Sequence, residues 1–498
     1  MTRLTQLTTH MRYMVYSVLL VAASLAFTGC AVGPKYKRPA VPVPPAYKEM
    51  GDWKTAQPND KNFGGNWWEI FQDPQLNTLE QQINVSNQNL KAAVAQYQQS
   101  RAALRYVRAD YYPTVTAAPS ASRQRYSNNR PPQSSNFDGI TFNDFVLPVN
   151  VSYQVNAWGR VSKNVESYRE QAQASAADLA VVNLSMHAEL AIDYFAARSL
   201  DAEEKLLQDT VTQYEQAFQL NEDRYQGGLA SEVEVEQART ILETTRAQMV
   251  DVGVARAQFE HAAAVLLGKT PAEFTLPPLP LTTPPPSIPV GIPSTLLERR
   301  PDIAGAERRV ASANAQVGLA KTAYYPLVDI MGSGGFESGS LATLLQGPSG
   351  FWAVGSSALV TLFDVGRRRA VNDQAKASYD SSVASYRETV LTAFQQVEDN
   401  LAALRVLEHE AGIQSTAVEA AQRSLSLSNT RYEGGVTSYL EVITAQNAAL
   451  ADEVTAVNIL GRRMANAVLL IEALGGGWDS ADLPQRPECC GKLASGGN

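Results

Sequence analysis

Two very long stretches without proline limit most strongly how this chain can fold. They run from Arg160 to Tyr225 and from Arg367 to Tyr432. Apolar residues recur in the first stretch at steps of three and four, as at Leu207, Val211, Tyr214 and Phe218. Each helix would be roughly 100 Å long at 1.5 Å per residue, which is too long for one globular core. We therefore expect both helices to pack lengthwise against similar helices in coiled-coil-like seams.

The sequence contains two copies of one pattern of residues. The run Arg224-Tyr225-Gln226-Gly227-Gly228 returns as Arg431-Tyr432-Glu433-Gly434-Gly435, a spacing of 431 − 224 = 207 residues. Three further marks return at the same spacing, namely Gly159-Arg160 with Gly366-Arg367, Glu234-Val235 with Glu441-Val442, and Gly268 with Gly475. A Tyr-Tyr-Pro run at 111–113 also returns, at 324–326. Five marks in the same order indicate an internal duplication.

The duplication divides the chain into six predicted segments. These are a signal peptide at 1–29, an extended lipidated segment at 30–73, repeat 1 at 74–270, a proline-rich connector at 271–301, repeat 2 at 302–475 and a tail at 476–498. Each repeat is expected to hold a helix, a β-hairpin (about 114–156 and 327–363) and a long helical hairpin (about 159–268 and 366–475). Because proline stiffens the chain and ends helices, the connector should be a strap between the repeats.

The predicted strands have one apolar and one polar face. Apolar residues alternate with polar ones at Val149, Val151, Tyr153 and Val155. The second copy, at 354–363, alternates more weakly, and the loops at 127–139 and 337–350 are rich in turn residues. This pattern suits a soluble sheet as well as a membrane barrel. Four strands cannot close a barrel, since small closed barrels need about eight, so strands in a membrane would require three chains and twelve strands.

The N-terminus has the pattern of a lipoprotein signal. Two arginines precede an apolar run at 15–26, which is too short to span a bilayer comfortably. The run Phe27-Thr28-Gly29-Cys30 resembles a bacterial lipobox and predicts acylation of Cys30, with an ordinary signal peptide as the alternative. Ala31, in place of a retaining aspartate, favours the outer membrane. No later stretch has eighteen uninterrupted apolar residues, so we expect no transmembrane helix after the signal, and crossing a membrane would need a closed β-barrel.

Three further sequence marks carry a family resemblance. They are the run from Cys30 to Pro39, Trp67-Trp68 followed by Phe71, Asp73, Pro74 and Leu76, and Leu297–Ile303 with Ala306-Glu307. In these marks, and over essentially the whole chain after the signal, the sequence resembles the TolC-type outer-membrane factor family and its lipoprotein branch, the NodT/OprM-like proteins.

The resemblance implies a fold and a function. The fold would be mainly α with a membrane β-barrel, a homotrimer whose 12-stranded barrel joins a periplasmic α-helical barrel. The function would be that of an outer-membrane exit duct for tripartite efflux, with no catalysed reaction and no cofactor beyond the covalent lipid on Cys30. The partners would be a periplasmic adaptor and an inner-membrane transporter, commonly of the resistance-nodulation-division type. That transporter would supply the energy, because this chain lacks a Walker-type glycine-rich loop.

The resemblance also implies a gate at the periplasmic end of the tunnel. Turns at the closed tip would use glycine to reverse the chain, at Gly227, Gly228, Gly434 and Gly435. Glu234 and Glu441 match pore-narrowing acidic positions, whereas Thr444 and Asn447 replace a second acidic residue and an arginine, so one ring of three glutamates is expected. Hydrogen bonds to these carboxylates would tie the helices shut, from Arg224, Tyr225, Arg431 and Tyr432. Solvated helix-face charges are the alternative.

Charge and composition argue against other functions. The net charge of −8 leaves no basic excess for nucleic acid. His187, His261 and His409 have no metal-ligand or catalytic-triad spacing. Cys489-Cys490 is expected to be a pair of loose tail thiols, because neighbouring cysteines close an awkward ring. A periplasmic coiled-coil adaptor or envelope tether without a pore remains the main alternative, with a protein-secretion duct as a second, and the exported cargo is not predicted.

Overall fold

We describe the protein from a computed structural model that covers residues 32–50, 65–128, 139–290 and 293–484. The predicted signal peptide, the lipidation site Cys30, Ala31 and the Cys489-Cys490 pair lie outside these residues. Acylation of Cys30 therefore stays a prediction.

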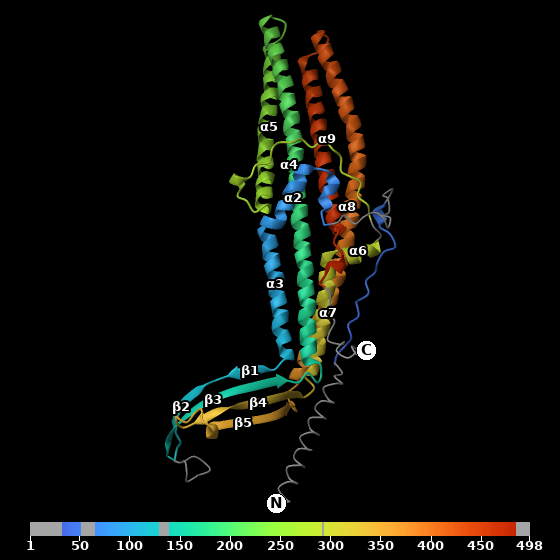
Figure 1. The fold of residues 1–498 in the computed structure, drawn as a ribbon. Helices are drawn as coiled ribbons and strands as arrows, with labels where there is room; N and C mark the ends of the chain where they lie inside the picture. The colour runs from blue at the N-terminus through green and yellow to red at the C-terminus, as the bar shows by residue number, and fades with distance from the viewer. Residues whose placement is uncertain (1–31, 51–64, 129–138, 291–292, 485–498) are drawn as a thin grey trace, which may run out of the picture. The chain divides into compact units, whose positions relative to one another are not determined.

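Helices make up most of the described chain (Figure 1). The α-helices are α2 (Pro74–Ser86), α3 (Gln88–Arg108), α4 (Arg160–Gln226), α5 (Glu232–Leu266), α6 (Pro293–Arg299), α7 (Pro301–Thr322), α8 (Arg367–Glu433) and α9 (Tyr439–Ala473). Short 3-10 turns lie at Lys48–Met50, Trp67–Phe71, Ala109–Tyr111, Pro271–Glu273, Gly347–Ser349 and Ser480–Asp482. The two long helices are confirmed, since α4 and α8 each hold 67 residues.

Local sequence explains where these helices begin. The side chain of Asp73 accepts hydrogen bonds from the backbone N–H groups of Gln75 and Leu76, at 2.9 and 3.1 Å, and so caps α2. Gly159 and Gly366, with φ of 76° and 85°, turn the chain immediately before α4 and α8. That left-handed conformation is cheap only for glycine, which explains why Gly-Arg occurs at both places.

One antiparallel sheet contains all the strands of the described residues, in the order β1-β3-β4-β5 with β2 also on β3. The strands are β1 (Thr114–Ala117), β2 (Ser120–Arg125), β3 (Thr141–Gln154), β4 (Leu327–Ser338) and β5 (Gly350–Leu359). β1 and β2 pair with successive parts of β3. Together they occupy the place of one strand beside β3. The pairing is interrupted at Ala118-Pro119, because proline has no N–H to donate.

The second hairpin ends earlier than the sequence predicts. Its last strand stops at Leu359, although we expected strand structure to residue 363. The Asp364 carboxylate instead accepts bonds from the N–H groups of Gly366 and Arg368, both at 3.1 Å, and so forms a turn into α8.

The chain forms two compact units. One holds the described part of Met1–Pro39 together with Gln98–Gln173 and Glu307–Ser385, which include the whole sheet, and the other holds Ala40–Tyr97, Ala174–Ala306 and the described part of Tyr386–Asn498. Each unit takes segments from both sequence repeats. The units of packing therefore differ from the units of duplication, and the predicted domain boundaries stay a prediction.

In the first unit, the N-terminal segment lies against α7 and the end of β3. The N–H of Val32 donates to the carbonyl of Trp158 at 3.3 Å, and the Asn314 side chain donates to the carbonyl of Pro34 at 3.2 Å. Gly33, at φ 131°, approaches Gly318 so closely that a Cβ on Gly33 would lie 2.6 Å from the Gly318 Cα. This contact requires glycine at position 33 and fixes the chain just after the predicted lipidation site.

In the second unit, a buried charge network holds the proline-rich connector. Arg198, 2% exposed, donates to Asp201 at 2.8 Å and to the carbonyl of Pro277 at 2.5 Å. Arg256 donates to the other Asp201 oxygen at 2.9 Å, and the N–H of Leu279 donates to Asp201 at 2.8 Å. The connector is thus bound as a strap to α4 and α5.

A second buried group in this unit joins α2 to α4. His187 Nδ1 lies 2.6 Å from Glu80 Oε2, and the His187 ring stacks on Trp68 with centroids 4.5 Å apart. Burial raises the pKa of Glu80 to about 9 and lowers the pKa of His187 to about 4. At neutral pH the pair therefore holds one proton, on Glu80, and carries no net charge.

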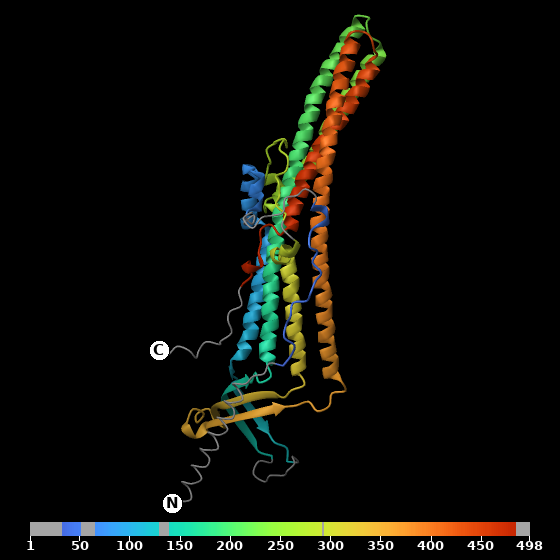
Figure 2. The ribbon, with the colours of Figure 1, turned by 90° about the vertical axis from the view of Figure 1, so that its right-hand side faces the viewer.

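One described helix is long and apolar enough to cross a membrane by length and composition alone, namely α9. This helix still contains charged residues, such as Asp452 and Arg462, and so is not one of the uninterrupted apolar stretches on which the sequence expectation rested. In the structure α9 is a packing helix, because Tyr439 and Val442 join Ala238 of α5 and Tyr432 of α8 in one core cluster. Figure 2 shows the α4–α5 and α8–α9 hairpins side by side where this core cluster joins them.

Candidate functional site

Both Gly-Gly pairs form the same turn at the end of a long helix. After α4, the N–H of Leu229 donates to the carbonyl of Arg224 at 2.7 Å, and the N–H of Gly228 donates to Tyr225 at 2.9 Å. After α8, Val436 and Gly435 repeat these bonds to Arg431 and Tyr432, both at 2.9 Å. This is a Schellman motif, which needs a left-handed residue. Gly228 and Gly435 supply it with φ of 72° and 71°.

The two candidate gate glutamates have different surroundings. Glu441 lies 3.8 Å from Arg431 in an ion pair whose side chains are more than half exposed. Glu234 instead forms a capping box at the start of α5, where the N–H of Ser231 donates to it at 3.3 Å. The hydroxyl of Thr444 donates to the carbonyl of Leu440 in its own helix, at 2.9 Å.

Tyr432 connects the two hairpins, but through a residue that the sequence analysis missed. Its hydroxyl donates to Asn221 Oδ1 of α4 at 2.5 Å, and Asn221 is fully buried. The Arg224 guanidinium lies over the Tyr432 ring, 4.6 Å from its centroid. Burial is the larger cause that raises the pKa of Tyr432, and the nearby Glu234 carboxylate is the smaller one. The hydroxyl therefore remains a proton donor at neutral pH.

Within one chain the Tyr432 hydroxyl thus bonds to Asn221 and not to a gate carboxylate, and its role in the gate stays a prediction. The signal for Asn221 was present in the sequence: continuing the apolar steps from Val211 through Tyr214 and Phe218 leads to position 221. A lone polar residue in such a seam commonly specifies the partner of a helix. Here it fixes Tyr432.

The two repeats differ at the equivalent tyrosine. Tyr432 is 5% exposed, whereas Tyr225 is 45% exposed and forms none of the contacts of Tyr432. Within one chain, therefore, only the second repeat's tyrosine is engaged by the neighbouring hairpin.

Where β1, β3, β4 and β5 pair, the sheet presents two chemically distinct faces. The strand register aligns Val115, Val151, Gly332 and Val354 in one row, and Ala117, Val149, Gly334 and Trp352 in the next row of the same face. Rows of the opposite face hold Thr114, Ser152, Met331 and Gly355, and Thr116, Asn150, Ser333 and Ala353. Trp352 and Val354 are 81% and 75% exposed. The first face is apolar and the second is mostly polar or small.

Aromatic residues collect where the sheet meets the helices of the same unit. Trp158, just after β3, stacks on Tyr325 with ring centroids 5.1 Å apart and donates to the carbonyl of Pro326 at 2.9 Å. Exposed tyrosines flank the same junctions, at Tyr111, Tyr112 and Tyr324. Rings with one apolar and one polar end suit a membrane–water interface.

Within the described residues no group of three or more His, Cys, Asp or Glu side chains is placed to hold a metal ion. His187 is paired with Glu80, while His261 and His409 lie exposed on separate helices. The arrangement of the described histidines thus offers no metal or triad geometry.

Comparison with known proteins agrees with this architecture. A family model described as outer membrane efflux protein matches residues 79–269 and 292–476. The cation efflux system protein CusC of Escherichia coli O6:H1 is 30% identical over 465 residues, covering 93% of this chain and 98% of CusC. The probable efflux pump outer membrane protein TtgC of Pseudomonas putida is 31% identical over 465 residues, covering 92% of this chain and 96% of TtgC.

Solved structures give the same answer for the fold. The outer-membrane channel OprN superposes with a TM-score of 0.84 at 28% identity, over 90% of this chain and 100% of OprN. The open state of the Neisseria gonorrhoeae MtrE channel superposes with a TM-score of 0.78 at 26% identity, over 91% of this chain and 99% of MtrE. The fold is that of the outer-membrane efflux channels, and the chain belongs to the outer membrane efflux protein family.

Proposed function

We propose that this protein is the outer-membrane exit duct of a tripartite efflux system. The two-faced sheet is the observation that carries this proposal. Side chains as apolar and exposed as Trp352 and Val354 are unfavourable in water. They suit a wall that faces lipid, while the polar face lines a water-filled lumen. The relatives are outer-membrane efflux proteins, which supports the same assignment.

The sheet supports a homotrimer. Its outer strands, β1/β2 and β5, have open edges within the chain. Unpaired backbone groups cost several kcal/mol each in hydrocarbon, so each edge pairs with another copy. Three copies of four strand lengths give a closed barrel of twelve strands. A periplasmic adaptor or tether without a pore would have to expose this apolar face and these open edges to water.

Cysteine labelling tests which face meets lipid. In a background carrying Cys489→Ser and Cys490→Ser, we expect Ala353→Cys to react with a water-soluble, membrane-impermeant thiol reagent. The adjacent Val354→Cys should react at least about tenfold more slowly, because lipid excludes the water-soluble reagent and keeps the thiol in its unreactive, unionised form. The labelling rate in outer-membrane vesicles gives the comparison. Equal rates, or the reverse order, would contradict the lipid-facing assignment.

We also place the gate of the duct at the two Schellman turns. Glu441 provides one carboxylate per chain, and its pairing with Arg431 is open to solvent. The closed state is held by Tyr432 through Asn221 and Arg224, across the two hairpins. Opening requires Tyr432 to leave Asn221. By the sequence equivalence of the repeats, Tyr225 would face the neighbouring copy.

Single-channel conductance in planar bilayers tests this gate. We expect Tyr432→Phe combined with Arg431→Ser to raise the open probability several-fold, since one buried hydrogen bond contributes about 1 kcal/mol and so shifts an equilibrium about fivefold. Tyr225→Phe is the matched variant in the first repeat. It removes no such bond within one chain, so any change that it causes would report on the interface between copies. An unchanged open probability in the double variant would remove Tyr432 from the gate.

Acylation of Cys30 would anchor the duct at the outer membrane. The contact of Val32 supports this, since it holds the chain, two residues after Cys30, at the aromatic junction of Trp158. A periplasmic adaptor and an inner-membrane transporter of the resistance-nodulation-division type would complete the system. Relatives carry names that refer to cation, toluene and antibiotic efflux, so family membership alone assigns no cargo.

A further inference from the structure

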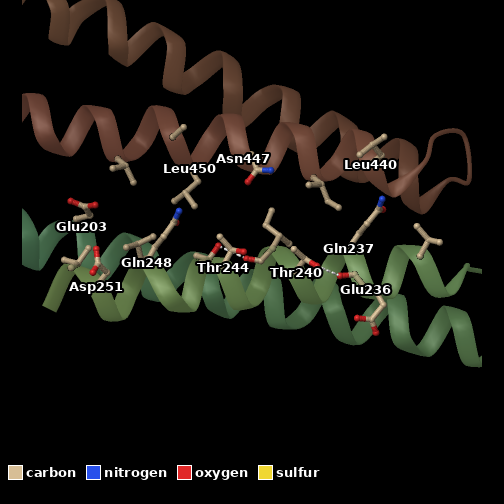
Figure 3. Close-up of a pocket in the computed structure, with 18 of the residues that line it drawn as sticks. Glu203, Glu236, Gln237, Thr240, Thr244, Gln248, Asp251, Leu440, Asn447 and Leu450 are labelled. Carbon is tan, nitrogen blue, oxygen red and sulfur yellow. Dashed lines mark hydrogen bonds between the residues drawn. The ribbon is translucent and has the colours of Figure 1, made fainter. Parts of the chain in front are cut away.

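A long groove lies between the two hairpins of the second unit, with one end at the first turns of α5 and α9. It has a volume of about 1200 Å³ and is lined by α4, α5 and α9 (Figure 3). Its walls carry apolar side chains, notably Leu207, Ile241, Val252, Ile443 and Leu450. Small-molecule sites usually occupy about 300–1,000 Å³ and are mostly apolar with a few polar groups, so this groove has room for such a ligand.

The charge in the groove has one sign. Glu203, Glu232, Glu236 and Asp251 line it, and none of its lining residues is lysine, arginine or histidine. Glu236 has an ion pair with Arg239 at 3.3 Å, outside the lining. Among the described residues, no ion pair or hydrogen bond joins Glu203 or Asp251 to a basic side chain. Burial raises the pKa of Glu203 above its usual value.

Figure 3 shows Glu203 and Asp251 together at one end of the groove, with Gln248 and Leu450 beside them. The two carboxylates come from different helices, α4 and α5. A positive group placed there would meet both carboxylates, while its apolar part would lie along the wall formed by Leu207, Val252 and Leu450.

We propose that this end of the groove binds small amphiphilic cations, such as a delocalised or quaternary ammonium carried on an aromatic or alkyl body. A helix of a partner protein is less well matched. Helix docking uses apolar anchors at i, i+3, i+4 and i+7 along the whole groove, whereas Thr240, Thr244 and Asn447 occupy the middle of this one. The proposal goes beyond the proposed duct function, because it concerns ligand binding in a groove within one chain.

The test is saturable binding of rhodamine 6G, a fluorescent amphiphilic cation, to the full-length protein in lipid nanodiscs. Fluorescence polarisation against empty nanodiscs separates protein binding from lipid partitioning. We expect Glu203→Gln combined with Asp251→Asn to raise the dissociation constant about tenfold, because two charge-assisted contacts are lost. Glu204→Gln, which changes the neighbouring carboxylate outside the groove, should leave the constant within about twofold. Anionic fluorescein should not bind.

Three results would overturn the proposal: binding that does not saturate above the nanodisc background, equal affinity in the double variant, or an equal loss in Glu204→Gln. A Thr244→Phe variant distinguishes binding inside the groove from a long-range effect of charge. It keeps every charge but narrows the groove, and it should also weaken rhodamine 6G binding. Bilayer conductance of the same variants stays at the wild-type level if the duct function is separate from this site.

Discussion

Replacing Arg198 with alanine is expected to lower the free energy of unfolding by about 3–5 kcal/mol, the usual cost of removing one partner from a buried ion pair. Arg198 is almost completely buried, and its guanidinium serves Asp201, the carbonyl of Pro277 and the side chain of Gln75. Without it, Asp201 would keep a buried charge compensated by Arg256 alone. The loss should appear as a lower denaturant midpoint of the purified protein, followed by tryptophan fluorescence.

Arg246→Ala is the matched control for this prediction. Arg246 also pairs with two carboxylates, Glu215 and Glu243, at 2.5 and 2.6 Å, but its side chain is 40% exposed. Exposed ion pairs contribute about 0–1 kcal/mol, so this variant should lose little. Thermolysin offers a second readout, because release of the connector would expose Phe274 and Leu276, which are buried in the native protein. If both arginine variants unfold alike, the network does not hold the strap.

The long helices could be predicted because their signals are local. Proline is absent over both stretches, and glycine marks each end, so the predicted limits of α4 and α8 agree with the structure to within one residue. The strand break was less predictable. Pro119 was visible in the sequence, but whether β1 and β2 form one strand or two depends on their pairing with β3. Register is a property of two segments together.

The network around Arg198 could not be predicted for a similar reason. Its partners come from α2, α4, α5 and the connector, up to 123 residues away in the sequence. No spacing rule links them. The contrast between Tyr225 and Tyr432 was also hidden, since the duplicated sequence makes the two residues look alike. Packing of α4 against α8 distinguishes them.

The paired Glu80 and His187 should give the folded protein an unusual dependence on pH. Folding raises the pKa of Glu80 from 4.5 to about 9, so above pH 4.5 the unfolded chain releases a proton that the folded chain retains. Stability from this group is therefore lost as pH rises towards 9. Folding lowers the pKa of His187 from 6.5 to about 4, and its stability is lost as pH falls below 6.5.

These two effects cancel between about pH 4.5 and 6.5, because each state then holds one proton on the pair. Above pH 6.5 only the Glu80 effect remains. The wild-type protein should then lose stability by about 1.4 kcal/mol per pH unit, which is the value of one proton. Other buried carboxyl groups, such as Asp193, add their own pH dependence, so the difference between variants is more informative than one profile.

Glu80→Gln isolates the contribution of the pair. The amide keeps a hydrogen-bonding partner for His187 Nδ1 but cannot ionise. Denaturant midpoints measured from pH 6.5 to 9 should therefore fall more steeply for the wild type than for Glu80→Gln, and the two curves should diverge steadily with pH. Parallel curves would mean that the folded pair retains no proton over this range, with Glu80 ionised and His187 neutral. In that case the buried contact between α2 and α4 would carry a net negative charge, and the pair would not cause the loss of stability above pH 6.5.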